Sequence, residues 1–352
     1  SQVPEAQLTP ASPPVAKSKP KPTALVIGGT GFIGRALTRR LVAQGRHVRV
    51  LSRGSVGPFP DLPEQVETVG VSLKDTEGLA EAMAGMDMVF NLARSLEKTW
   101  DAALRNDVAV AEGVADAAAK AKVKRLVYTG TIASYDMSDP FRKITEDTGF
   151  PDDMSDRNMY ARSKAECEKR LMAMHQTRDL PLTIARPGIV IGPGGPLQHW
   201  GIGRWHGAGA VRIWGHGRNT LPFVLNDDVA DGLILMGETE AAIGESYNLV
   251  GDPMLSARGY FDAISDRLGA QVRVASGNLY AFYAADSVKH LLKVHALRRK
   301  GAVKPSLADW KSRAHLSPFV NDKPKSMLGW TPEPDKDRFI DRGIAEAGLF
   351  GF

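Results

Sequence analysis

The chain has 352 residues, of which 43% are hydrophobic and 24% charged, and its 45 Lys and Arg against 40 Asp and Glu give a formal net charge of +5. This is the composition of an ordinary soluble chain, long enough for one large domain or for a domain with a smaller lobe. The absence of a dense Lys/Arg block argues against a nucleic-acid partner. The small positive excess suits an anionic cofactor or substrate, although a charge balance without functional meaning is an equal alternative.

Cys167 is the single cysteine of the chain, which excludes an intrachain disulfide framework and favours a reducing compartment. No apolar run reaches the roughly 18 residues that span a bilayer, and no signal-peptide core follows Ser1. We therefore expect a cytoplasmic protein without stable membrane insertion.

Residues 1–22 are rich in proline and lysine, a composition that buries little apolar surface. We expect this segment to be a disordered, extended linker. Because the chain begins with Ser rather than Met, a tether to an upstream domain is one interpretation, and a tail without function is the other.

The stretch TALVIGGTGFIG, Thr23–Gly34, organises the rest of the sequence. Its apolar run Ala24–Ile27 predicts a parallel strand that is buried on both faces. A glycine-rich turn and a segment of helical periodicity follow, and this context makes the glycines a dinucleotide-binding fingerprint. The glycines let the backbone approach a pyrophosphate at the helix N-terminus; a turn that serves backbone geometry alone is the alternative. The expected cofactor contacts here are Gly28, Gly29, Thr30, Gly31, Phe32, Ile33 and Gly34.

A second strand is predicted at His47–Leu51 and ends at Ser52 and Arg53. An acid at this place would select NAD, whereas an arginine accommodates the 2′-phosphate of NADP. The sequence offers Ser52, Arg53 and, just after the glycines, Arg35. These residues favour NADP, with NAD left open, and solvated arginines without such a role are the alternative.

Further strands and helices alternate along the chain: strands at Val66–Val71, Met86–Leu92 and Arg125–Thr129, and helices at Thr76–Ala84 and Trp100–Ala121. This alternation predicts an α/β protein with a Rossmann-like, doubly wound parallel sheet and right-handed crossovers.

Tyr160 and Lys164 open a predicted helix that runs to about Met174, and a spacing of four places both on one face. A lysine ammonium near a phenol lowers a pKa that is otherwise near ~10. The phenol can then exchange a proton with a substrate hydroxyl while hydride moves to or from a nicotinamide. Thr129 and Thr131 lie at the end of the fifth strand, where ligands of open α/β sheets bind. A surface pair is the alternative, but after the glycine turn the pattern favours catalysis.

With these motifs the chain resembles the extended branch of the short-chain dehydrogenase/reductase superfamily, the NAD(P)-dependent epimerase/dehydratase family, from about Thr23 to Trp330. The motifs are GGTGFIG (Gly28–Gly34), NLA (Asn91–Ala93), Thr131 four residues before Tyr135, YARSK (Tyr160–Lys164), RPGIVIGPG (Arg186–Gly194), NDDVA from Asn226, YNLVGD (Tyr247–Asp252) and LGWTP (Leu328–Pro332).

The resemblance implies that Tyr160 is the catalytic acid/base, that Lys164 binds the nicotinamide ribose and tunes Tyr160, and that Thr131 bonds the reacting oxygen. It also implies that Asp75 lies near the adenine and Pro187 to Ile189 near the nicotinamide amide. The remaining expected contacts are Leu92, Ala93, Thr129 and Gly188 for the cofactor, and Arg94, Ile132 and His199 for the substrate.

Two departures from the family pattern bear on the substrate. Sugar-nucleotide members often carry Asn in place of Ile189, and Arg-Asp in place of Leu221-Pro222. The loss of these polar groups weakens the case for a nucleotide-sugar substrate and leaves room for a ketone, an alcohol or another sugar derivative.

Three regions are expected: the linker at 1–22, an NAD(P)-binding Rossmann domain at 23–191, and a mainly substrate-binding lobe at 192–352, of which about 223–250 returns to the Rossmann domain. Loops are expected around 194–206. The basic, aromatic segment 279–300 is read as a helix that packs on the core or covers the substrate, with a membrane-surface helix as the alternative.

We interpret the chain as an NAD(P)-dependent oxidoreductase or epimerase/dehydratase that acts on a small molecule, since reductase and epimerase share every residue named. The alternative from another class is a non-catalytic NADP-binding regulatory or scaffold protein. No metal site is expected, and a homodimer is left open.

Overall fold

The computed structural model describes residues 20–52, 59–207 and 209–347. Most of the predicted linker, residues 1–19, and Arg53 therefore lie outside the described residues.

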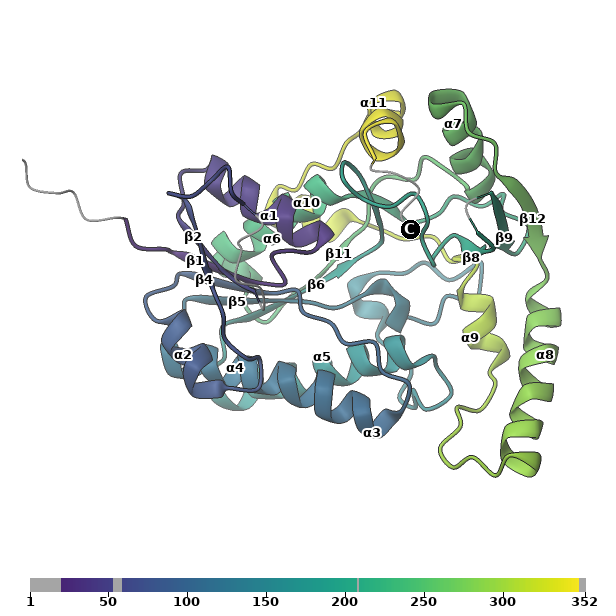
Figure 1. Ribbon diagram of the computed structural model, residues 1–352, viewed down its shortest axis with the longest axis horizontal. Helices are drawn as coiled ribbons and strands as arrows, with labels where there is room; N and C mark the ends of the chain where they lie inside the picture. Colours follow the sequence, from purple (N-terminus) through teal and green to yellow (C-terminus); the bar gives the residue numbers. More distant parts are fainter. Residues whose placement is uncertain (1–19, 53–58, 208, 348–352) are drawn as a thin grey trace, which may run out of the picture.

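A seven-stranded, all-parallel sheet forms the centre of the molecule, in the order β11-β6-β5-β4-β1-β2-β3 (Figure 1). Its strands are β1 (Ala24–Ile27), β2 (Val48–Leu51), β3 (Val66–Val69), β4 (Met88–Asn91), β5 (Arg125–Thr129), β6 (Leu182–Pro187) and β11 (Ser246–Leu249). The predicted Rossmann-like fold is confirmed. The strand order reverses between β1 and β4, so the connections that follow these two strands leave in opposite directions. Open sheets of this kind bind ligands at the carboxyl ends of the strands beside such a reversal.

Helices cover both faces of this sheet (Figure 1). Alternation along β1 sends Ala24 and Val26 into the core beneath α1 (Phe32–Ala43) and α6 (Asn226–Glu238). Leu25 and Ile27 enter the opposite core, which is closed by α2 (Thr76–Met83), α4 (Ala109–Ala121) and α5 (Met159–Arg178). That second core also contains Cys167, whose burial raises the pKa of its thiol to about 12.

The helix predicted at Trp100–Ala121 is interrupted. It consists of α3 (Trp100–Ala103), a π-helical turn η1 (Leu104–Val108) and α4. A π-turn adds one residue to the helical repeat, and here it faces the carboxyl end of the sheet with Asn106 and Asp107, which line a cavity described below.

The turn between β1 and α1 requires two of its glycines. Gly28 has a φ of +82°, which L side chains rarely adopt. A Cβ on Gly34 would lie 2.1 Å from the carbonyl oxygen of Gly28. Helix α1 can therefore approach the strand only with glycine at this place.

The remaining chain builds a second region beside the carboxyl ends of the strands. It holds the parallel pair β7 (Ile189–Ile191) and β10 (Phe223–Leu225), and the sheet of β8 (Gly203–Trp205), β9 (Ala210–Trp214) and β12 (Arg273–Gly277). Its helices are α7 (Ala257–Leu268), α8 (Leu279–Leu291) with the π-turn η5 (Leu292–Ala296), α9 (Leu307–Ser312), and α11 (Lys336–Ile340) with η6 (Asp341–Ala345). Helix α10 (Asp322–Leu328) packs instead against α6 and β11 of the central domain. Short 3-10 turns lie at η2 (Ile132–Ser134), η3 (Glu146–Thr148) and η4 (Glu240–Ala242).

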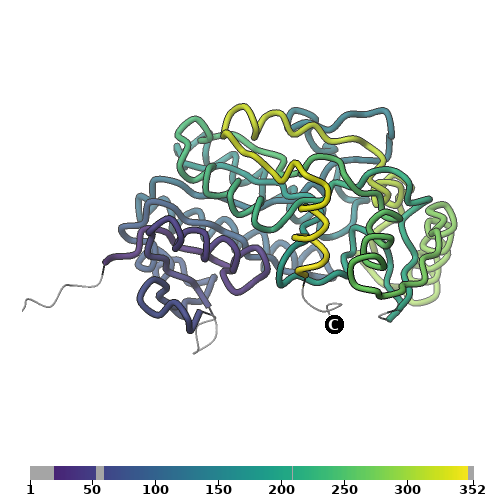
Figure 2. The backbone as a smooth tube through the Cα atoms, turned by 90° about the horizontal axis from the view of Figure 1, so that it is seen from above, coloured from purple at the N-terminus to yellow at the C-terminus, as the bar shows by residue number. Residues whose placement is uncertain are grey.

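Strand β8 occupies part of the region expected to be loops, because a three-residue strand is too short for its periodicity to be recognised. Figures 1 and 2 both place α8 at the end of the molecule opposite β2 and β3. No helix among residues 20–52, 59–207 and 209–347 is both long and apolar enough to cross a membrane.

A buried carboxylate on α9 connects the two regions. Asp309 Oδ1 accepts hydrogen bonds from Arg157 Nε at 2.8 Å and from the backbone nitrogen and Nδ2 of Asn158, each at 3.1 Å. The side chains of Arg157 and Asp309 are only 5% and 8% exposed. Asn158 in turn caps α5 by accepting a hydrogen bond from the backbone N–H of Ala161 at 2.9 Å. The start of α5 is therefore fixed by a residue about 150 positions later in the chain.

We predict that Asp309→Ala lowers the free energy of unfolding by about 3–5 kcal/mol, because it leaves the Arg157 guanidinium buried without its carboxylate. Urea denaturation monitored by circular dichroism measures this change. Asp61→Ala is the control, since it removes an exposed partner of Arg39 and should alter the midpoint little. Equal midpoints for the two variants would contradict the prediction.

Candidate active site

A cavity of about 810 Å³ lies along the carboxyl ends of the central strands, between the glycine turn and the second region. It brings together most of the residues that the sequence singled out: Gly28, Gly31, Phe32, Ile33, Gly34, Leu92, Arg94, Thr129, Thr131, Ile132, Tyr160, Lys164, Pro187, Gly188, Ile189 and His199. Segments far apart in the sequence thus converge on one hollow, which is the candidate active site.

Six expected contacts among the described residues do not line this cavity: Gly29, Thr30, Arg35, Ser52, Asp75 and Ala93. Gly29 instead faces β2, where an added Cβ would lie 2.6 Å from a methyl group of Val50. The Asp75 carboxylate caps α2 by accepting a hydrogen bond from the Gly78 backbone N–H at 3.0 Å. The Asp75 carboxylate therefore stabilises the start of α2 and does not line this cavity.

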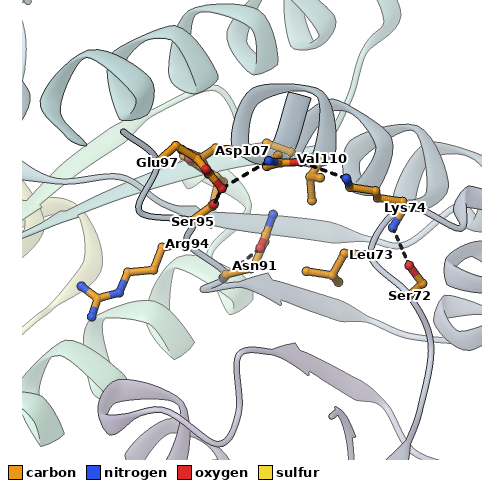
Figure 3. A pocket seen from close by; sticks show the side chains of 13 residues that line it. Ser72, Leu73, Lys74, Asn91, Arg94, Ser95, Glu97, Asp107 and Val110 are labelled. Carbon is orange, nitrogen blue, oxygen red and sulfur yellow. Dashed lines mark hydrogen bonds between the residues drawn. The ribbon is translucent and has the colours of Figure 1, made fainter. Parts of the chain in front are cut away.

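A second cavity of about 380 Å³ adjoins the first and shares Arg94 with it (Figure 3). Ser72, Leu73 and Lys74, which precede Asp75, line it together with Asn91 and Ala93. Along one wall, Lys74 Nζ donates to Asn106 Oδ1 at 2.9 Å, and Asn106 Nδ2 donates to Glu97 at 3.3 Å. Arg94 is turned away from the other labelled side chains of this cavity.

Lys164 is held at the junction of the two central strands. Its side chain is buried, and Nζ lies 3.2 Å from the carbonyl oxygen of Thr129 and 3.5 Å from that of Ala93. These carbonyls hold the ammonium at the carboxyl ends of β4 and β5. Tyr160, one turn earlier on α5, also lines the cavity and is half-buried.

Thr131 also lines the cavity and is the N-cap of the short 3-10 turn η2. Its Oγ1 accepts a hydrogen bond from the Ala133 backbone N–H at 3.1 Å. A hydroxyl whose oxygen is used as an acceptor keeps its own proton for donation. Thr131 can therefore donate to an oxygen atom placed in the cavity.

A buried ion pair between Arg186 of β6 and Glu168 of α5 stabilises the position of α5. Arg186 donates three hydrogen bonds to Glu168, the shortest at 2.8 Å, and a fourth, at 2.6 Å, to the hydroxyl of Tyr135. Burial raises the pKa of Glu168, and the neighbouring Arg186 opposes this. Glu168 is one turn beyond Lys164, so the pair fixes the helix face that carries Lys164.

The sequence did not identify Asp309, Ser312 and Arg313, which line the far wall of the cavity. Arg313 lies over the rings of Trp310 and Trp214, with its guanidinium carbon 3.8 Å and 5.3 Å from their centres. No local motif marks these residues, because their contacts join positions far apart in the chain.

Two neutral histidines lie at the same end. Burial lowers the pKa of His199 to about 4, with contributions from His315 and Arg94, and burial also lowers the pKa of His315 to about 4. His199 Nδ1 accepts a hydrogen bond from the Gly201 backbone N–H at 2.9 Å. The proton of this neutral imidazole is therefore on Nε2, which makes His199 a donor rather than a base.

The residues around the glycine turn fit a dinucleotide. Among the residues that the structure describes, no side chain caps the N-terminus of α1, so its first N–H groups are available to a pyrophosphate. Thr129 Oγ1, on the cavity wall, is buried and has no hydrogen-bond partner among the described residues. Within those same residues, no group of three or more His, Cys, Asp or Glu is arranged to hold a metal ion.

Comparison with known families gives one match across this region. The model of the NAD dependent epimerase/dehydratase family matches residues 24–250. The 2-alkyl-3-oxoalkanoate reductase of Stenotrophomonas maltophilia is 28% identical over 257 residues, which are 70% of this chain and 76% of that protein. A 4-hydroxy-2-methyl-3-oxo-4-farnesyl-3,4-dihydroquinoline-1-oxide ketoreductase of Stigmatella aurantiaca is 27% identical, over 76% of this chain and 78% of that protein. Protein y4nG of Sinorhizobium fredii is 30% identical over 60% of this chain, which here spans about half (52%) of that relative.

Solved structures share the fold. The crystal structure of gox2253 superposes with a TM-score of 0.72 at 22% identity and covers 93% of this chain and 98% of its own. The UDP-glucuronic acid 4-epimerase of Bacillus cereus, solved with UDP-glucuronic acid and NAD, gives a TM-score of 0.67 at 18% identity, with 92% and 98% covered.

The two histidines generate a pH dependence of stability. Their pKa of about 4 in the folded chain is below the ordinary value of 6.5, so the unfolded chain binds more protons between these values. We predict that the free energy of unfolding falls as pH drops from about 6.5 towards 4. Urea denaturation at pH 7 and pH 5 measures it: His315→Gln should reduce the difference, whereas His206→Gln, at an exposed position, should not. An unchanged difference in His315→Gln would refute the assignment.

Proposed function

Because this chain belongs to the NAD-dependent epimerase/dehydratase family, we propose that it is an NADPH-dependent reductase of an apolar ketone. The observation that carries the proposal is the lining of the cavity of about 810 Å³. One end of it holds the glycine turn, Tyr160 and Lys164. The rest is lined mainly by apolar and aromatic side chains, with Asp309, Arg313 and the two neutral histidines among them.

In the proposed reaction, Thr131, Tyr160 and Lys164 have distinct roles. When bound, the nicotinamide supplies the hydride. Thr131 donates a hydrogen bond to the substrate carbonyl oxygen, and the Tyr160 hydroxyl delivers a proton to that oxygen as it becomes an alcohol. Lys164 favours the resulting phenolate through its positive charge and offers its ammonium to the nicotinamide ribose. The carbonyls of Thr129 and Ala93, which accept from Nζ, keep the ammonium in place.

We assign the adenosine end of the cofactor to the smaller cavity. Ser72, Leu73 and Asn91 would face the adenine and its ribose, in place of Asp75, whose carboxylate is used in capping α2. The preference for NADP rests on Ser52, Arg53 and Arg35. Arg35 is exposed in the first turn of α1 and forms no ion pair among the described residues. Its charge is therefore available to a 2′-phosphate.

The cavity wall favours a ketone over a nucleotide sugar. Ile189 lines the wall, and Leu221 is buried in the adjoining core, at places where a sugar nucleotide would meet polar side chains. Arg94 and the Nε2–H of His199 are the donors we assign to a polar group of the substrate. The names of two relatives, a 2-alkyl-3-oxoalkanoate reductase and a ketoreductase, point to the same reaction class.

The regions expected from the sequence remain part of this proposal, with 23–191 binding the cofactor and the segment after 192 mainly binding the substrate. Helix α6 and β11 support the return of 223–250, since they pack on α1 and pair with β6. We place the protein in the cytoplasm, in keeping with its single cysteine.

The reaction is tested by following NADPH absorbance with a series of long-chain 3-oxo acids and apolar ketones. Tyr160→Phe should lower kcat about 10²–10⁴-fold and leave the Kd for NADPH nearly unchanged, because only the proton donor is lost. Lys164→Ala should impair both activity and cofactor binding. Full activity in Tyr160→Phe would overturn the role of Tyr160, and turnover of UDP-sugars alone would overturn the substrate class.

Cofactor choice has a separate test. We predict that the protein binds NADP(H) more tightly than NAD(H), that Arg53→Asp reverses the order, and that Arg35→Ala weakens NADP(H) binding about tenfold or more with little effect on NAD(H). Fluorescence titration measures both affinities. Arg39→Ala, one turn further along α1 and paired with Asp61, is the matched control. Equal or tighter NAD(H) binding by the unmutated protein would contradict the prediction.

A further inference from the structure

Helix α8 and its continuation η5 form an arm at the edge of the molecule (Figures 1 and 2). The first half of the arm is anchored to α9 and β9. The Phe282 ring stacks on Trp310 of α9 with centres 5.3 Å apart, and Trp310 Nε1 donates to Asp286 at 3.0 Å. Trp214 packs against the edge of Phe282 at 5.5 Å.

The second half of the arm exposes large apolar side chains. Val288, Leu291, Leu292 and Leu297 are 58%, 56%, 55% and 61% exposed. The first three recur at the three- and four-residue spacing of one helical face. A cluster of this kind on a surface marks a site of interaction.

The same segment is strongly cationic. Between Ser287 and Ala308 the sequence has no Asp or Glu, and it has six Lys and Arg: Lys289, Lys293, Arg298, Arg299, Lys300 and Lys304. Asp286, the nearest acid before them, is engaged by Trp310. The arm therefore combines an apolar strip with an unbalanced positive charge.

The apolar side chains and the positive charge together indicate which kind of partner can bind this surface. Two copies of the segment 288–304 facing each other would bring twelve like charges together, which opposes self-association through this face. A nucleic acid would satisfy the cations but leave Leu291 and Leu292 in water. An anionic lipid surface satisfies both features, because headgroups attract the cations while apolar side chains enter the acyl boundary.

The arm is also connected to the active-site cavity. Trp214 lines the cavity and packs against Phe282 of the arm, while Arg313 lines the cavity and lies over Trp310. A surface that receives the arm would thus lie close to the aromatic wall of the cavity.

We propose that α8 and η5 dock the protein reversibly on an anionic membrane surface, as a peripheral arm that does not span the bilayer. Docking places the aromatic end of the cavity near the lipid, from which an apolar ketone would enter. The inference of membrane docking depends only on the side chains of the arm and of the segment after it. The delivery of a ketone rests on the proposed function.

The test is sedimentation of the full chain with vesicles of phosphatidylcholine, with and without phosphatidylserine, at physiological salt. We expect binding to the mixed vesicles that high salt weakens. Lys293→Gln should lower the partition coefficient about fivefold, and the double variant Leu291→Ser, Leu292→Ser should lower it at least about tenfold. Unchanged circular dichroism and melting temperatures would show that the variants fold.

Phe141→Ser and Lys143→Gln are matched controls, because Phe141 is 92% exposed and Lys143 is also exposed, on a loop outside the arm. These controls should bind vesicles like the unmutated chain. The proposal is overturned by failure to bind mixed vesicles, by equal binding to neutral ones, by unaltered binding of the arm variants, or by a dimer that the double leucine variant dissolves. Vesicle binding requires no turnover, so a protein that binds vesicles but reduces no ketone would disprove the proposed function and leave the docking intact.

Discussion

The buried carboxylate of Asp309 is the constraint on which the geometry of the site depends. It accepts hydrogen bonds from Arg157 and from two nitrogens of Asn158, and Asn158 caps the helix that carries Tyr160 and Lys164. The second region of the fold therefore does more than close the cavity, because it also sets where α5 begins. Rigid placement of this kind matters for a proton donor, since its oxygen must lie within hydrogen-bond reach of the reacting atom.

The central sheet could be predicted because its signals are local. The apolar run Ala24–Ile27 and the strand Arg125–Thr129 appear at the predicted residues, and the alternation of strands and helices was enough to infer parallel order. The interrupted helix was not predicted, since a π-turn leaves the apolar periodicity of Trp100–Ala121 nearly unchanged. Strand β8 was missed because its hydrogen bonds come from β9, and three residues hold too little pattern.

The same distinction between local sequence signals and long-range contacts applies to the residues of the candidate site. The glycine turn, Thr131, Tyr160 and Lys164 belong to motifs, and the structure gathers them around one cavity. Asp309, Arg313 and His315 belong to no motif and reach the cavity through tertiary packing, so no local pattern could reveal them. For Asp75, the proximity to the adenine stays a prediction, and the structure shows its carboxylate capping α2. For Arg53, which lies outside the described residues, the sequence argument stands alone.

The burial of Cys167 has a practical consequence. Thiol reagents attack the thiolate, and a thiol with a pKa of about 12 inside the core offers almost none at neutral pH. Because these 352 residues contain no other cysteine, this chain gives no background reaction in site-directed thiol labelling. A cysteine introduced on the surface would carry a fluorophore or spin label at that position alone, without any prior removal of native thiols.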